Sequence, residues 1–578
     1  MTHKVKLSNN KKKKIREMVD QANQAFASGR HDVSDRLCRK IESLQPGHPD
    51  VANMRAVMCS YQGRADQAEQ LFMDAIRAAP KRSAFQANLG GFYLTQRRFV
   101  EAMACYKQAI SLAPDALSPR IGYCTALLET GCYEDAYLAL KKVVTHQSRD
   151  PGLVMAFFTA CHRSNRIEEG RQCLERVLEQ DPGHIQARFE LGMLEIETGH
   201  LDRGKAELRR VLEIKPDHVA SCSALSKIRQ YDDAGDADIG KVSRLYEQSA
   251  PDSRERMILG FALGKMMDDL GDCDRAFEYF REANDIRHRH SDYDNDRELA
   301  HLQGAMDAYT PEVLSRTSGL DDATPIFIVG MPRCGSTLVE QIMASHPGVA
   351  SRGEWCFFES RLLLDHHSKE DPLTLEKIVS LKLEQWREFG QTYLDHLKAD
   401  SSGATRITDK SLRNVRLIGA IHCALPKARI VHVRRHPLDT CLSIYKTNLQ
   451  DQLFDYGCNL GQLGYYYRMY LRLMQHWRDV LPRGVMYELD YEGLVANQEG
   501  ETRKLLDACD LEWDDHCLQF NKMDNLVRTA SVAQVRRSIY TDSVSGWKRY
   551  EKHLQPLIRI LGTEYGHPDS ESFDEAFE

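Results

Sequence analysis

The residues best suited to chemistry lie in a short loop, Gly330–Thr337, which follows the apolar run Ile326–Val329. The loop has a glycine near each end, an arginine inside it and two hydroxyl residues before an amphipathic segment. Backbone amides at a helix N-terminus, backed by the helix dipole, form an anion site. Arg333 can bind phosphate or sulfate oxygens through two N–H groups, and Gly335 lets the backbone approach the anion. The sequence therefore predicts an anion site here.

The spacing of this loop is that of a Walker A motif without its lysine. In a nucleotide triphosphatase a lysine follows the second glycine and reaches the β- and γ-phosphates. This chain has Ser336 at that place. A phosphate cradle without the lysine indicates a donor other than ATP and counts against a nucleotide-dependent kinase.

A second motif follows the apolar run Ile430–Val433. Arg435 stands at the expected carboxyl end of that strand, and Ser443 comes two helical turns later, so both can converge on one phosphate. The alternative is a capped helix, with Pro437 in its first turn and Asp439 stabilising its dipole. The position relative to the first loop favours the phosphate site.

Together the motifs resemble those of the sulfotransferase family. GMPRCGSTLVEQI is similar to the family's 5′-phosphosulfate loop, G-x-P-R-S-G-T-T-L, and RHPLDTCLS is similar to its 3′-phosphate motif. The resemblance spans about residues 324–550 and is strongest to bacterial tetratricopeptide–sulfotransferase proteins and to tyrosylprotein sulfotransferases. It implies 3′-phosphoadenosine-5′-phosphosulfate (PAPS) as sulfonyl donor, without a metal. Cys334 and Ser336 depart from the family pattern, where serine and threonine stand.

The resemblance assigns donor-binding roles residue by residue. The residues that would hold the 5′-phosphosulfate are Arg333, Cys334, Gly335, Ser336 and Thr337. Arg435 and Ser443 would hold the 3′-phosphate, with Arg434 as a competitor for the first of these roles. Near the nucleotide and in the tail, further residues resemble family positions: Tyr491, Ser531 beside the sulfonyl group, and Arg536 and Lys548 beside phosphates. Trp547 is interpreted as a core aromatic.

The catalytic residues that the resemblance implies are Glu354, Lys410, Arg333 and Ser531. Lys410 resembles the family lysine at the bridging oxygen, where charge accumulates as the S–O bond breaks and a cation stabilises the transition state. Glu354 matches the general base of tyrosylprotein sulfotransferases. Small-molecule sulfotransferases use a histidine instead, but we interpret His346 and His436 as structural.

These residues require a scaffold of strands and helices. Short apolar runs at 326–329, 430–433 and 485–489 alternate with amphipathic segments at 336–345, 411–425, 437–449, 462–481 and 498–509. This alternation predicts a P-loop-like three-layer α/β domain with a parallel sheet. Ligands of such sheets bind outside the carboxyl ends of the strands, here after Val329, Thr408 and Val433.

The N-terminal half carries an internal repeat. Five prolines fall on a 34-residue ladder with Ser148 in the vacant place, namely Pro46, Pro80, Pro114, Pro182 and Pro216. Small residues stand twenty-two positions after each place: Ala68, Ala102, Ala136, Gly170 and Gly204. Close helix crossing requires such residues, and proline ends a helix. The pattern resembles the tetratricopeptide repeat and implies a concave surface for a protein or peptide partner.

Four segments are therefore expected. Residues 1–225 form an all-α tetratricopeptide solenoid of about six repeats, and 226–320 form a further helical repeat or capping region, because the offsets return at Leu263 and Gly264 after a linker-like YDDAGDADIG. Residues 321–565 form the sulfotransferase domain, and 566–578 an acidic tail expected to be disordered.

Composition narrows the class of protein. A net charge of −7 argues against a general nucleic-acid binder. The sequence contains no run of 18 or more apolar residues, so a membrane-spanning helix is not expected. Sixteen cysteines without a CxxC pair or a signal peptide are typical of reduced thiols in the cytoplasm.

The sequence thus predicts a PAPS-dependent sulfotransferase whose repeats bind a protein partner or the acceptor. The acceptor supplies a hydroxyl group, with protein tyrosine as one candidate and a glycan, lipid or small molecule as others. Two alternatives are a tetratricopeptide scaffold with a non-catalytic nucleotide-binding domain, and a nucleotide-dependent kinase.

Overall fold

The structure is a computed structural model of the 578-residue chain that describes residues 9–144, 150–316, 319–364, 381–399, 403–449, 452–522, 539 and 544–562. The chain divides into two compact units, the second of which begins at Leu174. The predicted boundaries at residues 225 and 320 both fall inside this second unit. Ser148, Ser531, Arg536 and the acidic tail lie outside the described residues.

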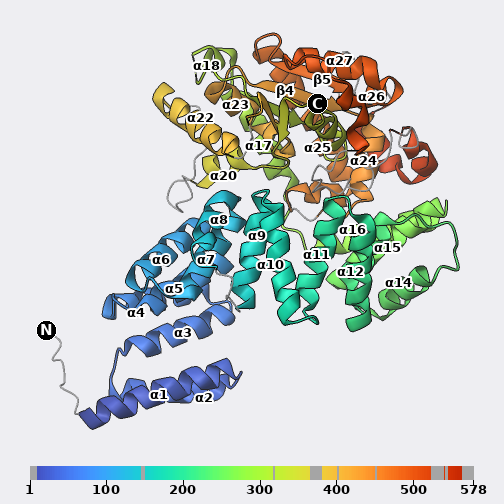
Figure 1. Cartoon of the computed structure of the whole chain (residues 1–578). Helices are drawn as coiled ribbons and strands as arrows, with labels where there is room; N and C mark the ends of the chain where they lie inside the picture. The colour runs from blue at the N-terminus through green and yellow to red at the C-terminus, as the bar shows by residue number, and fades with distance from the viewer. Residues whose placement is uncertain are drawn as a thin grey trace. The chain divides into compact units, whose positions relative to one another are not determined.

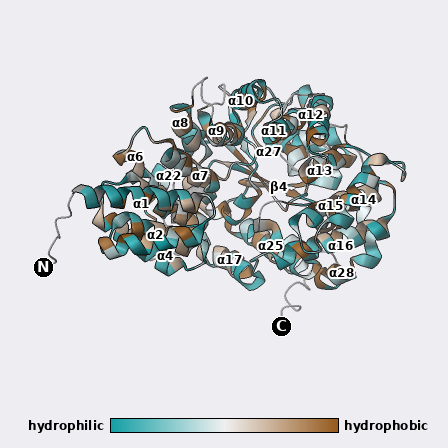
Figure 2. Cartoon of the chain, turned by 90° about the horizontal axis from the view of Figure 1, so that it is seen from below, coloured by the Kyte–Doolittle hydropathy of each residue, from teal (hydrophilic) through white to brown (hydrophobic). Residues whose placement is uncertain are grey.

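Helices occur in consecutive pairs up to residue 214. They are α1 (Asn9–Ala27), α2 (His31–Leu44), α3 (Pro49–Tyr61), α4 (Ala65–Ala78), α5 (Ser83–Thr95), α6 (Phe99–Leu112), α7 (Leu117–Glu129), α8 (Tyr133–Lys141), α9 (Pro151–Arg163), α10 (Ile167–Gln180), α11 (Ile185–Glu197) and α12 (Leu201–Ile214). Each ladder proline follows the end of an even-numbered helix by two residues. Figure 2 shows α1 and α2 with both hydrophilic and hydrophobic residues, as expected of helices that bury one face.

The column of small residues marks the helix crossings. Ala68, Ala102 and Ala136 are fully buried. At Gly204 an added Cβ would lie 2.5 Å from the Ile196 side chain and 2.8 Å from the Gly192 carbonyl oxygen. A larger residue would therefore separate α11 from α12, which confirms the packing reason for the column.

Six further helices precede the sheet. They are α13 (Val219–Ile228), α14 (Ala237–Gln248), α15 (Arg254–Asp269), α16 (Cys273–Arg289), α17 (Asn295–Ala308) and α18 (Pro311–Arg316). The linker-like segment between α13 and α14 packs against α15. Tyr231 is 1% exposed, and its amide donates to Asp269 Oδ2 at 3.1 Å. Asp236 caps α14.

The C-terminal part of the second unit contains a five-stranded parallel sheet of order β2-β3-β1-β4-β5. The strands are β1 (Pro325–Val329), β2 (Val349–Ser351), β3 (Arg406–Asp409), β4 (Arg429–Arg434) and β5 (Met486–Asp490). The predicted α/β fold with a parallel sheet is confirmed. The short edge strand β2 carries no apolar run and was not predicted.

Helices cover both faces of this sheet (Figure 1). They are α19 (Ser336–Ala344), α20 (Phe357–Leu364), α22 (Leu383–Lys398), α23 (Ile418–Ala424), α24 (Pro437–Tyr445), α25 (Leu460–Val480), α26 (Tyr491–Ala496), α27 (Gln498–Ala508) and α28 (Gln555–Leu561), with 3-10 turns η1 (Leu412–Arg416), η2 (Gln452–Cys458), η3 (Asp515–Lys522) and η4 (Gly546–His553). Alternate strand residues enter different cores: Ile326 and Ile328 pack with α19 and α27, whereas Phe327 and Val329 pack with α22 to α25.

One continuous hydrophobic core joins helices α14–α17 to the sheet. Tyr246, Phe280 and Tyr309 belong to the same buried cluster as Phe327 and Trp477. Tyr309 packs its ring 5.9 Å from that of Trp477 in α25. Helices that carry repeat-like spacing are therefore built into the same core as the sheet.

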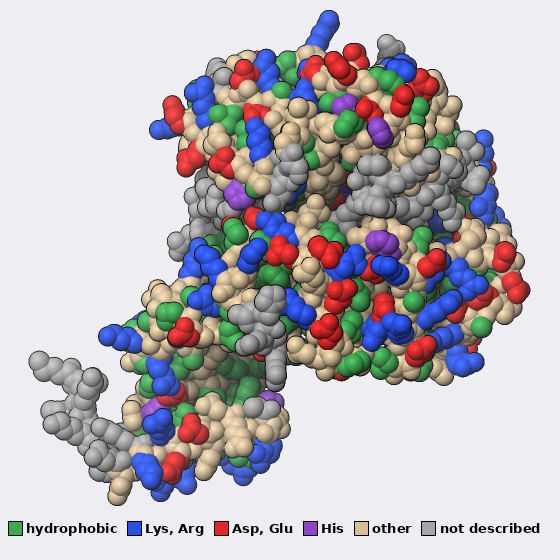
Figure 3. Space-filling model, in the orientation of Figure 1, with side chains coloured by type: hydrophobic (Ala, Val, Ile, Leu, Met, Phe, Trp, Pro, Cys, Tyr) green, Lys and Arg blue, Asp and Glu red, His purple; other side chains and the backbone are tan. Residues whose placement is uncertain are grey.

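Charges on the surface are mixed. On the face shown in Figure 3, Lys and Arg side chains are interspersed with Asp and Glu. Among the described residues, none of the helices combines the length and apolar character that a membrane crossing requires.

Candidate functional site

The first anion motif forms the turn from β1 into α19. Three residues here adopt left-handed backbone angles: Gly330 (φ +155°), Arg333 (φ +68°) and Gly335 (φ +103°). A Cβ atom at Gly335 would lie 2.4 Å from the ring of Tyr491, so only glycine allows this approach. Ser336 and Thr337 open α19 and are buried. The first-turn amides and these hydroxyls together suit an anion.

The two predicted anion motifs meet in space. Arg333 Nε donates a hydrogen bond to Ser443 Oγ at 3.1 Å. Arg435 Nη1 donates to the Arg333 carbonyl oxygen at 2.9 Å. The Arg435 guanidinium also lies 4.8 Å from the centre of the Tyr491 ring. The loop after β1, the turn that leads into α24, the last turn of α24 and the start of α26 therefore assemble around two guanidinium groups.

The geometry also separates Arg435 from its competitor. Arg434 faces two acidic side chains, with Nη1 3.4 Å from Glu488 Oε2 and Nε 3.5 Å from Asp490 Oδ1. Arg435 differs from Arg434 in that it also donates to the backbone of the anion loop, so the structure brings Arg435 to that loop.

Lys410 and Glu354 form an ion pair at the carboxyl end of β3. Lys410 Nζ donates to Glu354 Oε1 at 2.6 Å. Lys410 is 1% exposed, whereas the Glu354 side chain is 47% exposed. Burial alone would lower the pKa of Lys410, but the carboxylates of Glu354 and Glu340 more than offset it and hold the pKa above its ordinary value. A buried ammonium beside a solvent-facing carboxylate is thus placed next to the anion loop.

Asp439 does more than stabilise the dipole of its own helix. Its carboxylate is 4% exposed and accepts hydrogen bonds from the amides of Ser545 at 2.8 Å and Trp547 at 2.9 Å. It therefore fixes η4 against α24. Trp547, as predicted, is a core aromatic, and its ring stacks on His436 at an interplanar angle of 7°.

The remaining predicted residues differ in their placement. His346 is bonded to backbone, since Nδ1 accepts from the Gly348 amide and Nε2 lies 3.0 Å from the Glu512 carbonyl oxygen. Lys548 is exposed, and Cys334 is 1% exposed with a pKa raised by burial. Ser531 and Arg536 lie outside the described residues.

Two further residues border the site. Glu340 of α19 is 3% exposed and interacts electrostatically with Lys410. Lys227, at the end of α13, keeps contact with solvent, yet the surrounding protein and the Arg333 guanidinium lower its pKa. A glutamate inside the apolar helix STLVEQIMA was a signal for the first residue. Nothing in the sequence pointed to the second.

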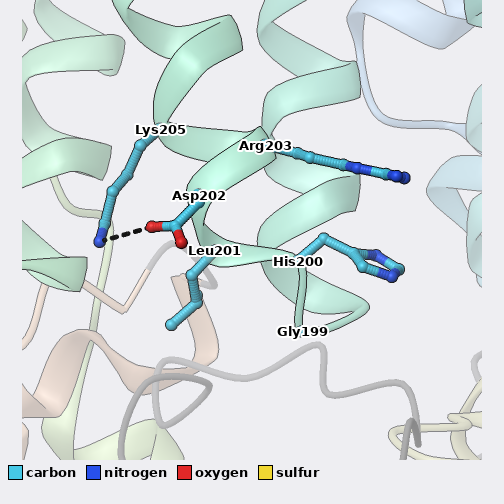
Figure 4. A pocket seen from close by; sticks show the side chains of 6 residues that line it. All are labelled: Gly199, His200, Leu201, Asp202, Arg203 and Lys205. Carbon is cyan, nitrogen blue, oxygen red and sulfur yellow. Dashed lines mark hydrogen bonds and ion pairs between the residues drawn. The ribbon is translucent and has the colours of Figure 1, made fainter.

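A separate hollow lies at the start of α12 and is lined by Gly199, His200, Leu201, Asp202, Arg203 and Lys205 (Figure 4). All six residues come from one turn of chain, and Lys205 pairs with Asp202 at 3.4 Å. This hollow contains none of the predicted site residues.

Comparisons with known proteins match both parts of the chain. Residues 325–515 match the model of the sulfotransferase family. Residues 60–116 and 162–228 match tetratricopeptide repeat models. A solved structure from a study of Pseudomonas aeruginosa pilF aligns over 38% of this chain and 100% of its own, at 13% identity and a TM-score of 0.34.

Two curated relatives extend the similarity. An uncharacterised protein of Aquifex aeolicus is 32% identical over 407 residues, which cover 69% of this chain and 53% of that protein. A protein-tyrosine sulfotransferase of Drosophila melanogaster is 23% identical over 282 residues, which cover 42% of this chain and 54% of that protein. The chain thus spans about half the length of the curated relatives it matches. It carries tetratricopeptide repeats in its N-terminal part and a sulfotransferase-family domain in its C-terminal part.

Proposed function

We propose that the protein transfers the sulfonyl group of PAPS to an acceptor hydroxyl. The observation that carries the proposal is the convergence of Arg333, Arg435 and Ser443 beside the Lys410–Glu354 pair. The donor set fits the ligand, because guanidinium groups, hydroxyls and helix amides are the groups that bind phosphate and sulfate esters.

Each group of site residues is proposed to contact a different part of the donor. Ser336, Thr337 and the amides that open α19 would hold the 5′-phosphosulfate, and Ser443 with Arg435 would hold the 3′-phosphate. Lys410 would stabilise the negative charge that develops on the bridging oxygen. Because Lys410 is buried and already charged, it needs little reorganisation as that charge appears.

Glu354 is proposed as the general base. Its carboxylate faces solvent on one side and Lys410 on the other, so an acceptor can reach it. As the acceptor oxygen bonds to sulfur, its proton passes to Glu354. The S–O bond to the phosphate breaks, and adenosine 3′,5′-bisphosphate leaves.

Protein tyrosine is the acceptor we favour. The support is the similarity to a protein-tyrosine sulfotransferase and the presence of repeats, which commonly present concave surfaces to peptides. We also propose a cytoplasmic location, which the sixteen free thiols support.

Binding and transfer test the proposal separately. Adenosine 3′,5′-bisphosphate, but not ATP, should stabilise the protein, by about 2.7 kcal/mol at a ligand concentration one hundred times the dissociation constant. Transfer from ³⁵S-labelled PAPS to tyrosine peptides and to lysate fractions then identifies the acceptor. Equal stabilisation by both nucleotides, or by neither, would sink the assignment.

Two variants test the chemistry, with a third as control. Lys410→Ala should lower kcat by about 10²–10³-fold, the usual cost of one transition-state donor, and Glu354→Gln by about 10²–10⁴-fold. Both should retain stabilisation by adenosine 3′,5′-bisphosphate. Lys427→Ala removes an exposed lysine of the same domain and should leave turnover unchanged.

A further inference from the structure

A buried carboxylate on α19 reaches the segment that carries Glu354. Glu340 lies one turn beyond the anion loop, on the helix whose first residues are Ser336 and Thr337. Its Oε1 accepts a hydrogen bond from Ser351 Oγ at 2.8 Å. Because Glu340 is 3% exposed, this bond is shielded from water.

Further hydrogen bonds connect Ser351 to the residues beside the Lys410–Glu354 ion pair. The Gly353 amide donates to Ser351 Oγ at 3.3 Å. The Gly353 carbonyl oxygen accepts from the Lys410 amide at 2.9 Å, and the Arg352 amide donates to the Thr408 carbonyl oxygen at 2.9 Å. Glu354 is the next residue along the chain. The segment 351–354 is thus held by β3 on one side and by Glu340 on the other.

Gly353 has a φ of +66° and no side chain of its own, so this part of the turn depends on hydrogen bonds. Arg352 adds a second anchor, because its Nη2 donates to the His396 carbonyl oxygen and its guanidinium lies 5.6 Å from the centre of the Trp355 ring. A shift of about 1 Å in a reacting group can cost about 10²-fold in rate.

We infer that Glu340 is a positioning residue that sets the place of the Glu354 carboxylate against Lys410 by holding Ser351. This inference rests on the proposed function for its kinetic consequence. Glu340 thereby links α19, whose first residues are proposed to bind the donor, to the segment 351–354, which carries the proposed base. Burial raises the pKa of Glu340 and Lys410 opposes that rise.

Three variants in the full chain test the inference. Glu340→Ala removes the acceptor of the Ser351 hydroxyl, whereas Glu340→Gln keeps an acceptor oxygen but loses the charge. Ser345→Ala is the matched control, because this buried serine at the end of α19 donates only to its own helix, at Gln341 O.

The first readout needs no activity. Hydrogen–deuterium exchange of the peptide containing residues 350–355 should be at least about fivefold faster in Glu340→Ala than in the wild type. Exchange in Glu340→Gln and Ser345→Ala should be within about twofold of the wild type. Unchanged exchange in Glu340→Ala overturns the inference, whether or not the protein proves to be a sulfotransferase.

The second readout is kinetic. Glu340→Ala should lower kcat by about 10–100-fold while the Kd for adenosine 3′,5′-bisphosphate changes less than about threefold. Glu340→Gln should recover most of the kcat.

If the glutamine variant is as slow as the alanine variant, the charge of Glu340 matters rather than its hydrogen bond, and the inference is wrong. A parallel loss of nucleotide binding would indicate general damage to α19 and would also overturn it. A wild-type protein without transfer refutes the proposed function and leaves the exchange result to decide the role of Glu340.

Discussion

Two helical hairpins of this chain share one spacing and serve different purposes. In α5–α6 the repeat positions are Leu89, Gly90, Ala102, Tyr106 and Ala109, and in α15–α16 they are Leu263, Gly264, Ala276, Phe280 and Ala283. All ten are hydrophobic or small. Eight of them are at most 5% exposed, and the two glycines lie against an aromatic ring at the helix crossing. The crossing between the two helices is therefore built the same way in both hairpins.

The difference lies at the positions outside this shared set. Three equivalent positions, counted from Leu89 and from Leu263, are apolar in the first hairpin and polar in the second. In α5–α6 and the residue after it they are Leu94, Ile110 and Ala113, and in α15–α16 they are Asp268, Asn284 and Arg287. Each of these three polar residues bonds to the sulfotransferase domain. The polar contacts of α5–α6 instead run to a neighbouring repeat, where Tyr93 and Arg98 bind Glu69 of α4. In α15–α16 these three polar positions connect a hairpin with repeat spacing to the sulfotransferase-family domain.

The largest contrast concerns ion pairs. Arg287 and Asp455 are 12% and 6% exposed and lie 2.7 Å apart, whereas Arg98 and Glu69 are 18% and 25% exposed. Asp455→Ala leaves a buried guanidinium without this carboxylate and should cost about 3–5 kcal/mol in the second unit. Glu69→Ala should cost about 1 kcal/mol in the first, because Arg98 keeps Glu101. Urea-dependent pulse proteolysis, with peptides assigned to each unit by mass spectrometry, measures both. Equal losses would remove the distinction between the hairpins.

The glycines at the two crossings provide the next test. An added Cβ would lie 2.5 Å from the Phe280 ring at Gly264 but 3.1 Å from the Tyr106 ring at Gly90. Gly264→Ala should therefore lose about 1–3 kcal/mol through overpacking. Gly90→Ala should stay within about 1 kcal/mol of the wild type, because the gain in helix propensity offsets a milder clash. Only Gly264→Ala should also weaken binding of adenosine 3′,5′-bisphosphate. The same proteolysis assay and a nucleotide titration distinguish the two.

These examples indicate what sequence can and cannot predict here. The parallel sheet and the helix pairs followed from local patterns, because strands and repeat helices have fixed spacings. The two anion motifs were expected at one site, but the direct bond from Arg333 to Ser443 was not predicted, since the resemblance assigns these residues to different ends of the donor. The role of Asn284 did not follow from a local pattern either, since its partner Tyr445 is 161 residues away and only the fold brings them together. For the same reason, the capped-helix alternative gives Asp439 a role only in its own helix, whereas its carboxylate accepts hydrogen bonds from η4 and the residue before it. Patterns predict elements; contacts between distant elements depend on side-chain packing that no local spacing encodes.

Asn284 gives a smaller but more specific effect. Its Nδ2 donates to the Phe280 carbonyl oxygen at 2.9 Å and to the Tyr445 carbonyl oxygen at 2.8 Å. Tyr445 is the last residue of α24, so this bond satisfies a carbonyl that the helix leaves unpaired. Asn284→Ala should cost about 1–2 kcal/mol. It should also weaken nucleotide binding several-fold, because Ser443 lies in the same final turn.

The control for that variant is Ile110→Ala, at the equivalent position of α6. It should lower the stability of the first unit and leave the Kd for adenosine 3′,5′-bisphosphate unchanged in calorimetric titration. A nucleotide affinity that falls equally in both variants would contradict the separate roles of the hairpins.

The smallest expected effect is a pH dependence confined to α15–α16. Burial would raise the pKa of Asp268, but Lys446, Tyr550 and Arg549 outweigh it and hold the pKa below its ordinary value. A carboxyl group with a lowered folded-state pKa stabilises the protein above its unfolded-state pKa of about 4, and this contribution is lost as the pH falls through the folded-state value. The stability difference between wild type and Asp268→Asn should therefore be constant from pH 7 to about pH 5 and shrink toward pH 3.

Leu94 occupies the equivalent place in α5, so Leu94→Ala should give a difference that does not depend on pH. Urea midpoints for each unit at pH 7, 5 and 3 decide the matter, and an Asp268→Asn difference that persists unchanged at pH 3 would show that the ion pair does not stabilise the hairpin's contact with α24 and η4.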